Sequence, residues 1–456
     1  MLTNTVSGRL SDADGLSARL KGVAVKIKRG CLVAMFLLGL CRMGNAQTST
    51  VIAHVAVVNV VTGDIQADRT VVITGNLIAS IGPNDQALLP DGARVVDARG
   101  QFIIPGLWDM HVHLGNATEA ALPVLVYYGI TGVRDMGSPS YATLRRWRIE
   151  ALSGARIGPR IVSCGPILHS GPPYFWGVEV HSPEEGRKVV DQLAESGVDF
   201  IKVTSDIDRQ TYFAIADEAR KLDLPLSGHL PTNDNGVGFK VSAVEASNNG
   251  QKSLEHSQGI PFPFEEKDPN LIPALLRNRT WVVPTLTAYW ASAHVHELAE
   301  SAAKDPRTKH IAPTFRQFWD GQLGDFGSKN EIRLQILKWR IEQVPELEKA
   351  GVGLLAGTDM GFPYVFPGDL IRELELMVQA GLSPLQALQT ATINPAKYLN
   401  KEREMGTVEP GKIADLVLLG TNPLEGIQNL RKVRAVVLNG RFLDRAKLDS
   451  ILPNFQ

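Results

Sequence analysis

The fold of this chain is decided by the stretch Ile103-Ile104-Pro105-Gly106-Leu107-Trp108-Asp109-Met110-His111-Val112-His113-Leu114-Gly115, in which an apolar run ends in His-Val-His. If residues 107–113 form a strand, its period of two places His111 and His113 on the same face. Two neutral imidazoles side by side at a strand end are suited to hold one zinc ion or a neighbouring transition metal. A single His-x-His pair is a weak indication, however, because most such pairs are incidental.

A second His-Val-His, at His294-Val295-His296, serves as an internal control. The surrounding residues 289–300 are rich in Ala, Leu and Glu, which predicts a helix. Residues two apart on a helix point in different directions and do not share a metal ion. We therefore expect His294 and His296 to face solvent.

The composition is that of an ordinary globular protein and limits the classes of function. The chain has 456 residues, enough for more than one domain, of which 44% are hydrophobic and 21% charged. A formal charge of -1, with no long basic run after the leader segment at residues 1–46, argues against nucleic acid as the main partner. Cys31 and Cys41 lie in that leader, so Cys164 is left without a partner for an intramolecular disulfide.

Residues 1–46 are predicted to form an export signal with a long front. Residues 26–29 are mainly basic, and residues 31–41 are apolar but too short to span a bilayer comfortably. Small residues at 44–46 suit cleavage before Gln47. A core helix is the alternative, which the basic front and the small-residue end disfavour. We expect a periplasmic or secreted protein without stable membrane insertion once the signal is removed.

The segments on either side of the middle of the chain share a pattern of strands and turns. Residues 71–82 read as a β-hairpin, and the same pattern returns near the carboxyl end. Neither terminal segment is large enough for a secure core of its own. We predict that residues 47–105 and 401–456 pack together as one small composite β-sandwich beside a middle domain at 106–400.

The middle domain alternates strand-like and helix-like segments, which is typical of a parallel α/β fold. Apolar spacing predicts helices over 184–196 and 210–222, and 288–345 reads as inserted helices near the active face. Eight strand-like runs predict a (β/α)8 TIM barrel. These runs lie at 107–113, 129–136, 160–164, 199–203, 224–229, 253–257, 280–285 and 352–359.

Barrel enzymes place their chemistry at the carboxyl ends of the strands, so the residues there are the candidates. Each has an ordinary explanation: a lone histidine is more often structural, Lys202 is able to extend its ammonium outward, and Asp359 is able to cap a helix. Such residues occur at five of the eight predicted strand ends, and to explain all of them in these ordinary ways would require several independent coincidences. The candidates are His111 and His113 at the first strand, Lys202 at the fourth, His229 at the fifth, His256 at the sixth and Asp359 at the eighth.

With these residues the chain resembles the amidohydrolase superfamily, most closely its prolidase-like and imidazolonepropionase-like branch. The resemblance covers nearly all of the mature chain, to residues 405–416, and the ligand order His-x-His, Lys, His, His, Asp is complete. Members with this set hold two divalent ions, often zinc, bridged by hydroxide and by a carboxylated lysine. The resemblance implies one ion at His111, His113 and Asp359, a second at His229 and His256, and Lys202 as the bridging carbamate.

The resemblance also implies a mechanism. An ammonium at Lys202 has no lone pair and repels cations, whereas a carbamate is anionic and bidentate. A hydroxide between two cations is a nucleophile near neutral pH, and Asp359 is expected to carry its proton to the leaving nitrogen. Related one-metal deaminases have a Glu three residues after the fifth-strand His, where this chain has Thr232. With Lys202 present, this departure favours the two-metal arrangement over deamination or a one-metal ring-opening.

We therefore expect a metal-dependent hydrolase that cleaves an amide bond of a dipeptide or an N-acyl amino acid, in the manner of an Xaa-Pro dipeptidase. His169, after the third strand, is the candidate to line the pocket and assist catalysis. Arg134, Tyr128 and Tyr364 are positioned in the sequence to contact a carboxylate or a ring of the substrate, but an ordinary structural role explains each of them at least as well. Two other functions stay open: an esterase, lactonase or phosphotriesterase with the same metals, and a non-catalytic scaffold, which normally loses ligands. A homo-oligomer is compatible with the sequence.

Overall fold

The computed structural model describes residues 49–171, 177–233, 238–262, 265–326 and 330–455. The export signal expected at residues 1–46 lies outside the described residues. Within the described ranges, no helix is both long enough and apolar enough to cross a membrane.

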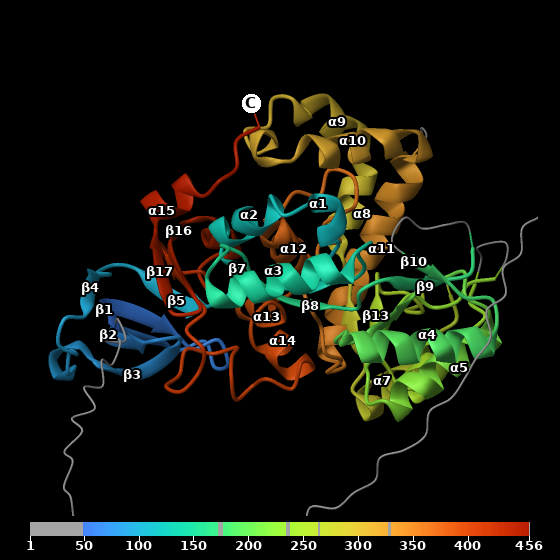
Figure 1. Cartoon of the computed structure of the whole chain (residues 1–456), viewed down its shortest axis with the longest axis horizontal. Helices are drawn as coiled ribbons and strands as arrows, with labels where there is room; N and C mark the ends of the chain where they lie inside the picture. Colours follow the sequence, from blue (N-terminus) through green and yellow to red (C-terminus); the bar gives the residue numbers. More distant parts are fainter. Residues whose placement is uncertain (1–48, 172–176, 234–237, 263–264, 327–329, 456) are drawn as a thin grey trace, which may run out of the picture. The chain divides into compact units, whose positions relative to one another are not determined.

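Strands from both ends of the described chain form one eight-stranded sheet (Figure 1). Its strands are β1 (Ser49–Val58), β2 (Ile65–Thr74), β3 (Leu77–Pro83), β4 (Arg94–Asp97), β5 (Phe102–Pro105), β15 (Leu416–Leu419), β16 (Val433–Leu438) and β17 (Arg441–Asp444). The order is β17-β16-β15-β5-β1-β2-β3, with β4 paired to β1. The two terminal segments meet where β5 runs antiparallel to β15 and Ile104 lies opposite Val417. The expected hairpin is present as β2 and β3.

The apolar side chains of this sheet come from both terminal segments. Ile52, Val55 and Ile103 pack in one buried cluster with Leu416 and Val437. Each fully buried aliphatic side chain contributes about 1.5–3 kcal/mol, so the segments supply together a core that neither is large enough to form alone. All eight strands belong to one hydrogen-bonded sheet, and the two-layered sandwich therefore stays a prediction.

Two parallel sheets occupy the middle of the chain. The smaller one is β6 (Leu107–Val112), β7 (Ile130–Asp135) and β8 (Arg160–Ser163); the larger one, in spatial order, is β10 (Gly177–Glu179), β9 (Ile167–His169), β11 (Ile201–Val203), β12 (Leu226–Gly228), β13 (Gln251–Glu255) and β14 (Trp281–Val283). Seven predicted runs contain strands, whereas β9 and β10 were not predicted. Every residue of β6 and β7 is buried, which explains why these strands read as apolar runs.

The eighth predicted run, 352–359, is not a regular strand, and the prediction is wrong in that respect. Leu354 in this run makes a single bridge to Val282 of β14, and Met360, the residue after the run, makes a single bridge to Val112 of β6. The backbone of Asp359 turns to a φ of 58°, which interrupts a continuous ladder. The segment nevertheless lies between β14 and β6, and the described chain is an α/β protein.

Helices connect the strands (Figure 1), and two of them test the predicted spacing directly. α4 covers Pro183–Ser196 and α5 covers Arg209–Lys221, which confirms both predicted helices to within a residue at each end. The segment expected to hold inserted helices contains α8 to α11. The other helices are α1 (Leu114–Ala117), α2 (Ala121–Tyr127), α3 (Tyr141–Ser153), α6 (Ala243–Asn248), α7 (Leu271–Asn278), α8 (Leu286–Ala293), α9 (Val295–Ala302), α10 (Pro313–Gln322), α11 (Asn330–Lys349), α12 (Leu370–Gln379), α13 (Pro384–Thr390), α14 (Ile393–Tyr398) and α15 (Arg445–Ser450), with 3-10 turns η1 (Asn84–Gln86), η2 (Thr308–His310), η3 (Leu323–Phe326) and η4 (Ile427–Arg431).

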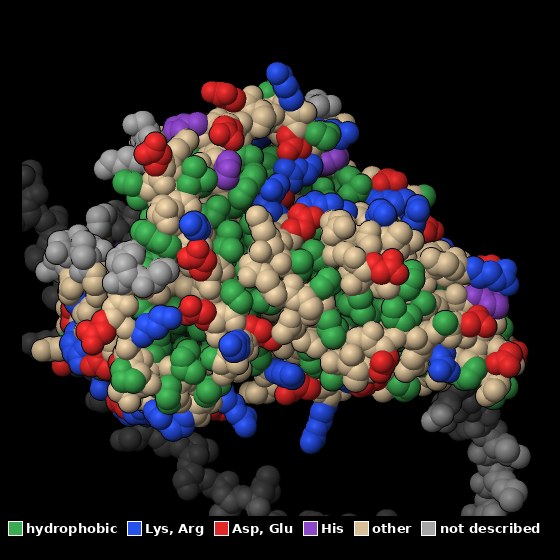
Figure 2. All heavy atoms as spheres, turned by 180° about the vertical axis from the view of Figure 1, so that it is seen from behind, with side chains coloured by type: hydrophobic (Ala, Val, Ile, Leu, Met, Phe, Trp, Pro, Cys, Tyr) green, Lys and Arg blue, Asp and Glu red, His purple; other side chains and the backbone are tan. Residues whose placement is uncertain are grey.

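The face opposite to the view of Figure 1 carries mixed charge. Figure 2 shows basic and acidic side chains interspersed there among apolar ones. Neither sign forms a continuous field on this face, in keeping with the formal charge of -1 for the whole chain.

Candidate metal centre

Six side chains singled out in the sequence lie at or just beyond the carboxyl ends of neighbouring parallel segments. His111 is on β6 and His113 follows that strand; Lys202 is on β11; His229 follows β12; His256 follows β13; Asp359 belongs to the segment between β14 and β6. Within each parallel sheet the carboxyl ends of the strands lie at the same edge, and the segment 352–360 bridges β14 of the larger sheet and β6 of the smaller one.

His111, His113 and Asp359 form the first group. Oδ1 of Asp359 lies 3.5 Å from Nε2 of His111 and 3.3 Å from Nε2 of His113. The backbone N–H of Asp359 donates to the carbonyl of His111 at 2.8 Å. That bond holds the carboxylate beside the two imidazoles.

His229 and His256 form the second group, with their Nε2 atoms 3.1 Å apart. The ring centroid of His256 lies 5.0 Å from that of His229 and 4.8 Å from that of His111. One ligand atom each from His111, His256 and Asp359 lies within 4.8 Å of the others. His256 therefore joins the two groups into one cluster.

Lys202 is buried beside this cluster, with 2% of its surface exposed. Burial lowers the pKa of Lys202, and the charge of Lys202 in turn lowers the pKa of His111, His229 and His256. The neighbouring Gly228 has a φ of +118°, and a Cβ there would lie 2.4 Å from the carbonyl oxygen of Val203 and 3.0 Å from Cγ of Lys202. Only glycine lets β12 approach β11 this closely.

Three of the imidazoles are held at Nδ1 by a fixed partner. The bonds run from His111 to Glu255 Oε2 at 2.7 Å, from His113 to the Gly137 carbonyl at 3.1 Å, and from His256 to Thr285 Oγ1 at 2.8 Å. A proton on Nδ1 leaves the lone pair of Nε2 available in each ring. The three Nε2 atoms are thereby prepared as acceptors or ligands.

The cluster favours neutral imidazoles and an ionised carboxylate. Burial lowers the pKa of His111 to about 4 and that of His256 to about 3, and it lowers the pKa of His229 as well. Burial opposes ionisation of Asp359, but the surrounding His111, His113 and His256 outweigh it and hold the pKa of this carboxyl well below its ordinary value. Neutral imidazole and carboxylate are the forms that bind metal ions.

The backbone at the cluster adopts conformations that side chains rarely take. His256 and Asp359 both have a φ of 58°, in the left-handed region. Gly361 has a φ of +133°, and a Cβ there would lie 2.6 Å from Cβ of His113. Such positions cost of order 1–3 kcal/mol each and concentrate at functional sites, because the surrounding structure has to maintain them.

The residues present fit a metal centre. Nε2 of His111 is buried and has no hydrogen-bond partner within the described ranges. Bonds of about 2.0–2.1 Å to one tetrahedral ion place neighbouring ligand atoms roughly 3.3 Å apart. The separations of 3.5 Å and 3.3 Å to Asp359, and of 3.1 Å between His229 and His256, are close to that value.

Sequence reasoning missed Glu255 as a partner of the cluster. Its fully buried carboxylate contacts His111 and, at 2.9 Å, Nη2 of Arg134. Burial opposes ionisation of Glu255, but Arg134 and His111 outweigh it and hold its pKa well below the usual range. The available signal was the pattern of Glu255 and Arg134 as charged residues inside two apolar strand runs, since buried charges are rarely left unpaired.

The residues considered for substrate binding have varied positions. His169 ends β9, next to β11, is 2% exposed, and its ring lies against Gly177; a catalytic role for it stays a prediction. Arg134 is fully buried in the pair with Glu255, so it does not line a pocket.

The hydroxyl of Tyr364 donates to Asp320 at 2.7 Å, and Tyr128 packs beside Gly368. Thr232 donates through its hydroxyl to the carbonyl of Ser205 at 3.3 Å.

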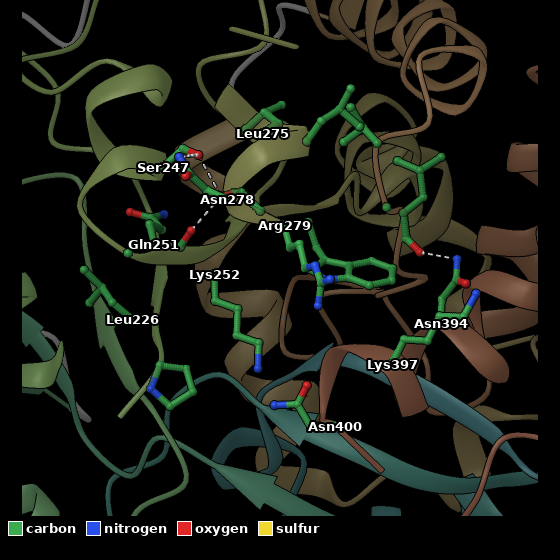
Figure 3. Close-up of a pocket in the computed structure, with 18 of the residues that line it drawn as sticks. Leu226, Ser247, Gln251, Lys252, Leu275, Asn278, Arg279, Asn394, Lys397 and Asn400 are labelled. Carbon is green, nitrogen blue, oxygen red and sulfur yellow. Dashed lines mark hydrogen bonds between the residues drawn. The ribbon is translucent and has the colours of Figure 1, made fainter. Parts of the chain in front are cut away.

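A large cavity opens at the other end of the same strands. It measures about 1030 Å³ and is lined by Leu226, Gln251 and Trp281, the first residues of β12, β13 and β14. Figure 3 shows Lys252 and Arg279 extending into it. The histidine cluster follows the last residues of β12 and β13, so this cavity is separate from it.

The second His-Val-His differs from the prediction. His294 lies at the junction of α8 and α9, and both His294 and His296 are half-buried instead of facing solvent. The ring of His294 stacks on Trp290 at 4.7 Å, and its Nδ1 donates to the carbonyl of Trp290 at 2.8 Å. The aromatic neighbour one turn earlier explains the burial.

Comparisons with known proteins identify related sequences and structures. The model of the Amidohydrolase family matches residues 102–443. An adenine deaminase from Mesorhizobium japonicum is 23% identical over 387 residues, which cover 83% of this chain and 54% of that relative. The chain thus spans little more than half the length of this curated relative.

Two solved structures share the fold. A Bifidobacterium longum protein, provisionally named a prolidase, has a TM-score of 0.72 and 24% identity, with 89% of this chain and 98% of that chain covered. A Xaa-Pro dipeptidase with methionine bound in its active site has a TM-score of 0.67 and 22% identity, with 87% and 100% covered. At this identity the likeness establishes the fold alone.

Proposed function

This chain belongs to the amidohydrolase family, and from that premise we propose that it is a metal-dependent hydrolase that cleaves a carbon–nitrogen bond. The proposed substrate is a dipeptide or an N-acyl amino acid. The observation that carries the proposal is the cluster itself: Nε2 of His111 is buried without a hydrogen-bond partner in the described part of the chain, beside the carboxylate of Asp359. An atom of this kind is costly to bury unless a ligand satisfies it.

Two divalent ions, zinc being the expected metal, are assigned to the cluster. His111, His113 and Asp359 would hold one, and His229 and His256 the other. When bound, such ions polarise a carbonyl and lower the pKa of water. Burial disfavours the ammonium of Lys202, which supports its conversion to a carbamate: the neutral Nζ bonds to the carbon of CO2 and releases one proton.

Asp359 is proposed to move the proton. Its carboxylate is held ionised by the surrounding imidazoles, and its backbone is fixed to β6 by the bond to the carbonyl of His111. An ionised carboxylate is able to accept a proton from water and return it to the leaving nitrogen, which otherwise departs as a poor leaving group. The fixed imidazoles keep the group aligned during this transfer.

The proposed scaffold is a single (β/α)8 barrel. The segment 352–360 supports it, because it hydrogen-bonds to the smaller parallel sheet and to the larger one. The N–H of Met110 donates to the carbonyl of Ala356 at 2.9 Å, and the N–H of Leu355 donates to that of Val282 at 3.0 Å. We also propose export to the periplasm or the medium, which fractionation of cells producing the full chain would test.

Deamination is the rival with an observation in its favour, because several similar sequences are named adenine deaminases. Thr232 argues against it here, since a hydroxyl bonded to the carbonyl of Ser205 is a poor proton carrier beside a carboxylate. An esterase, lactonase or phosphotriesterase would use the same cluster.

The decisive experiment is metal analysis of the purified protein together with activity assays on dipeptides, N-acyl amino acids, esters, phosphotriesters and adenine. We expect bound zinc and hydrolysis of at least one dipeptide or N-acyl amino acid. Release of ammonia from adenine, with no amide hydrolysed, would replace the proposal by deamination. Bound metal with no amide hydrolysed would refute the amidase assignment.

A further inference from the structure

A buried ion pair adjoins the histidine cluster without belonging to it. Arg134 of β7 and Glu255 of β13 are fully buried, and Nη2 of Arg134 lies 2.9 Å from both carboxylate oxygens of Glu255. Removing two charges from water costs several kcal/mol per ion, and apolar side chains of similar volume often stabilise a fold equally well. Stability alone is therefore a poor explanation for charges at this place.

Glu255 makes a second contact that links the pair to the cluster. Its Oε2 accepts the proton of His111 Nδ1 at 2.7 Å. The bond selects one tautomer and fixes the ring, so that Nε2 of His111 is directed toward Asp359, 3.5 Å away. No other described side chain hydrogen-bonds to the ring of His111.

Arg134 in turn fixes Glu255 and the strands around it. Its Nε donates to the carbonyl of Met110 at 2.6 Å, next to His111, and its Nη1 donates to Tyr398 Oη at 2.7 Å and to Ser253 Oγ at 2.9 Å. The Tyr398 hydroxyl also lies 2.9 Å from Oγ of Ser227 on β12. One guanidinium thus ties together β6, β13 and α14, and through Tyr398 it reaches β12.

We propose that Arg134 and Glu255 are a positioning pair that sets the metal affinity of the His111 side of the cluster. Glu255 aims Nε2 of His111 at the ion, and Arg134 holds the carboxylate in place. The inference rests on the proposed function only in that a divalent ion binds at His111. Carboxylates that hold a ligating histidine typically contribute 10–100-fold in metal affinity.

Glu255→Gln tests the proposal with a side chain of nearly the same volume. Zinc affinity of the purified full chain is measured by competition with a chelator, and thermal unfolding of the metal-free protein is followed in parallel. We expect the affinity for one ion to fall by about 10–100-fold, with a smaller effect on the second ion. Unchanged affinity for both ions would overturn the proposal.

A double variant separates positioning from folding. Arg134→Met combined with Glu255→Met removes both charges, and such replacements are often neutral or stabilising for a fold. We expect the metal-free melting temperature to be maintained and the zinc affinity to fall as in Glu255→Gln. A folded double variant with the zinc affinity of the unsubstituted protein would contradict the inference.

Tyr398→Phe is the matched control, because it removes a hydroxyl whose hydrogen-bond partners are Arg134, Ser227 and Ser253, outside the six cluster residues. Its zinc affinity is expected to stay within about threefold, well below the loss typical of a histidine's carboxylate partner. A loss as large as that of Glu255→Gln would also overturn the inference, since any damage to the network would then suffice. If the unsubstituted protein binds zinc but hydrolyses no amide, the proposed function fails while this inference is still tested.

Discussion

The two His-Val-His stretches of this chain have the same sequence and different surroundings. His111 and His113 are at the end of β6, each with its Nδ1 bonded to a fixed acceptor and its Nε2 within 3.5 Å of Asp359. His294 and His296 are at the junction of two helices, where the ring of His294 stacks on Trp290. The difference shows that the spacing of two histidines acquires chemical meaning from the backbone that carries them and from the partner of each second nitrogen.

The largest expected effect is the loss of bound metal and of activity when a histidine of the first stretch is replaced, whereas replacement of a histidine of the second stretch should leave the metal in place. His111→Asn or His113→Asn is expected to lower kcat/KM by more than about 100-fold and to remove bound zinc, because even the partners of ligands contribute 10–100-fold. Metal content after dialysis, together with kcat/KM on a substrate found in the panel, checks this. His294→Asn and His296→Asn are the matched controls; loss of zinc from either of them would break the comparison.

The glycine that packs against the first stretch is expected to tolerate substitution less well than a glycine of α10 whose added Cβ meets no neighbour. In Gly361→Ala the new Cβ would lie 2.6 Å from Cβ of His113 at a φ of +133°, so we expect the free energy of unfolding to fall by about 2–4 kcal/mol. In Gly321→Ala, within α10, the added Cβ meets nothing within 4 Å, and a gain of up to about 1 kcal/mol is expected. Denaturant unfolding measures both, and equal effects would contradict this interpretation.

A pH-dependent contribution to stability is located at the start of α8, the helix that leads to the second stretch. Glu373 of α12 accepts the N–H groups of Leu286 and Thr287 at 3.0 Å and 2.6 Å, at the start of the helix that ends before His294. Burial raises the pKa of Glu373 from 4.5 to about 8. Because the folded state binds this proton more tightly than the unfolded state, its stabilisation is complete below about pH 4.5 and is lost as the pH rises through about 8.

Glu373→Gln is therefore expected to flatten the pH profile of the free energy of unfolding over that interval. The difference in free energy of unfolding between the unsubstituted protein and Glu373→Gln should change by a few kcal/mol across this pH interval, since one pKa unit corresponds to about 1.4 kcal/mol. Urea unfolding at a series of pH values measures it. Parallel profiles for both proteins would show that Glu373 titrates in its ordinary range.

The smallest expected effect is on the second stretch itself. His294→Ala removes the stack on Trp290 and the hydrogen bond to its carbonyl, and we expect a loss of about 0.5–1.5 kcal/mol in the free energy of unfolding. Thermal and denaturant unfolding check this value. A loss of several kcal/mol would contradict this prediction, because a half-buried histidine with one stacking contact and one such hydrogen bond is not expected to contribute that much to stability.

The parts of the fold that are recoverable from sequence are those with a local signature. Buried parallel strands appear as apolar runs, and His229 is conspicuous because it follows Ser-Gly at the end of such a run. β9 and β10 have three residues each, too few for a period to be recognised. The irregular segment 352–359 looks like a strand because its apolar residues are buried between two strands without a continuous ladder.

The parts of the site that escape sequence reasoning depend on residues far apart in the chain. Arg134 and Glu255 are each anomalous within their own strand, yet their pairing is visible only once β7 and β13 are placed together. The left-handed backbone of His256 and Asp359 has no local cause, because neither residue is glycine. Tertiary packing imposes both the ion pair and the left-handed backbone, so neither is predictable from a local sequence pattern.

The pairing of Ile104 with Val417 has a consequence for biosynthesis. β5 leaves the ribosome early, but its neighbour β15 is translated only after almost the entire intervening chain. Until then one edge of the nascent sheet is open, and open edges recruit foreign strands. Premature termination between residues 360 and 415 should thus give an aggregation-prone product even though every residue of the cluster has already been made.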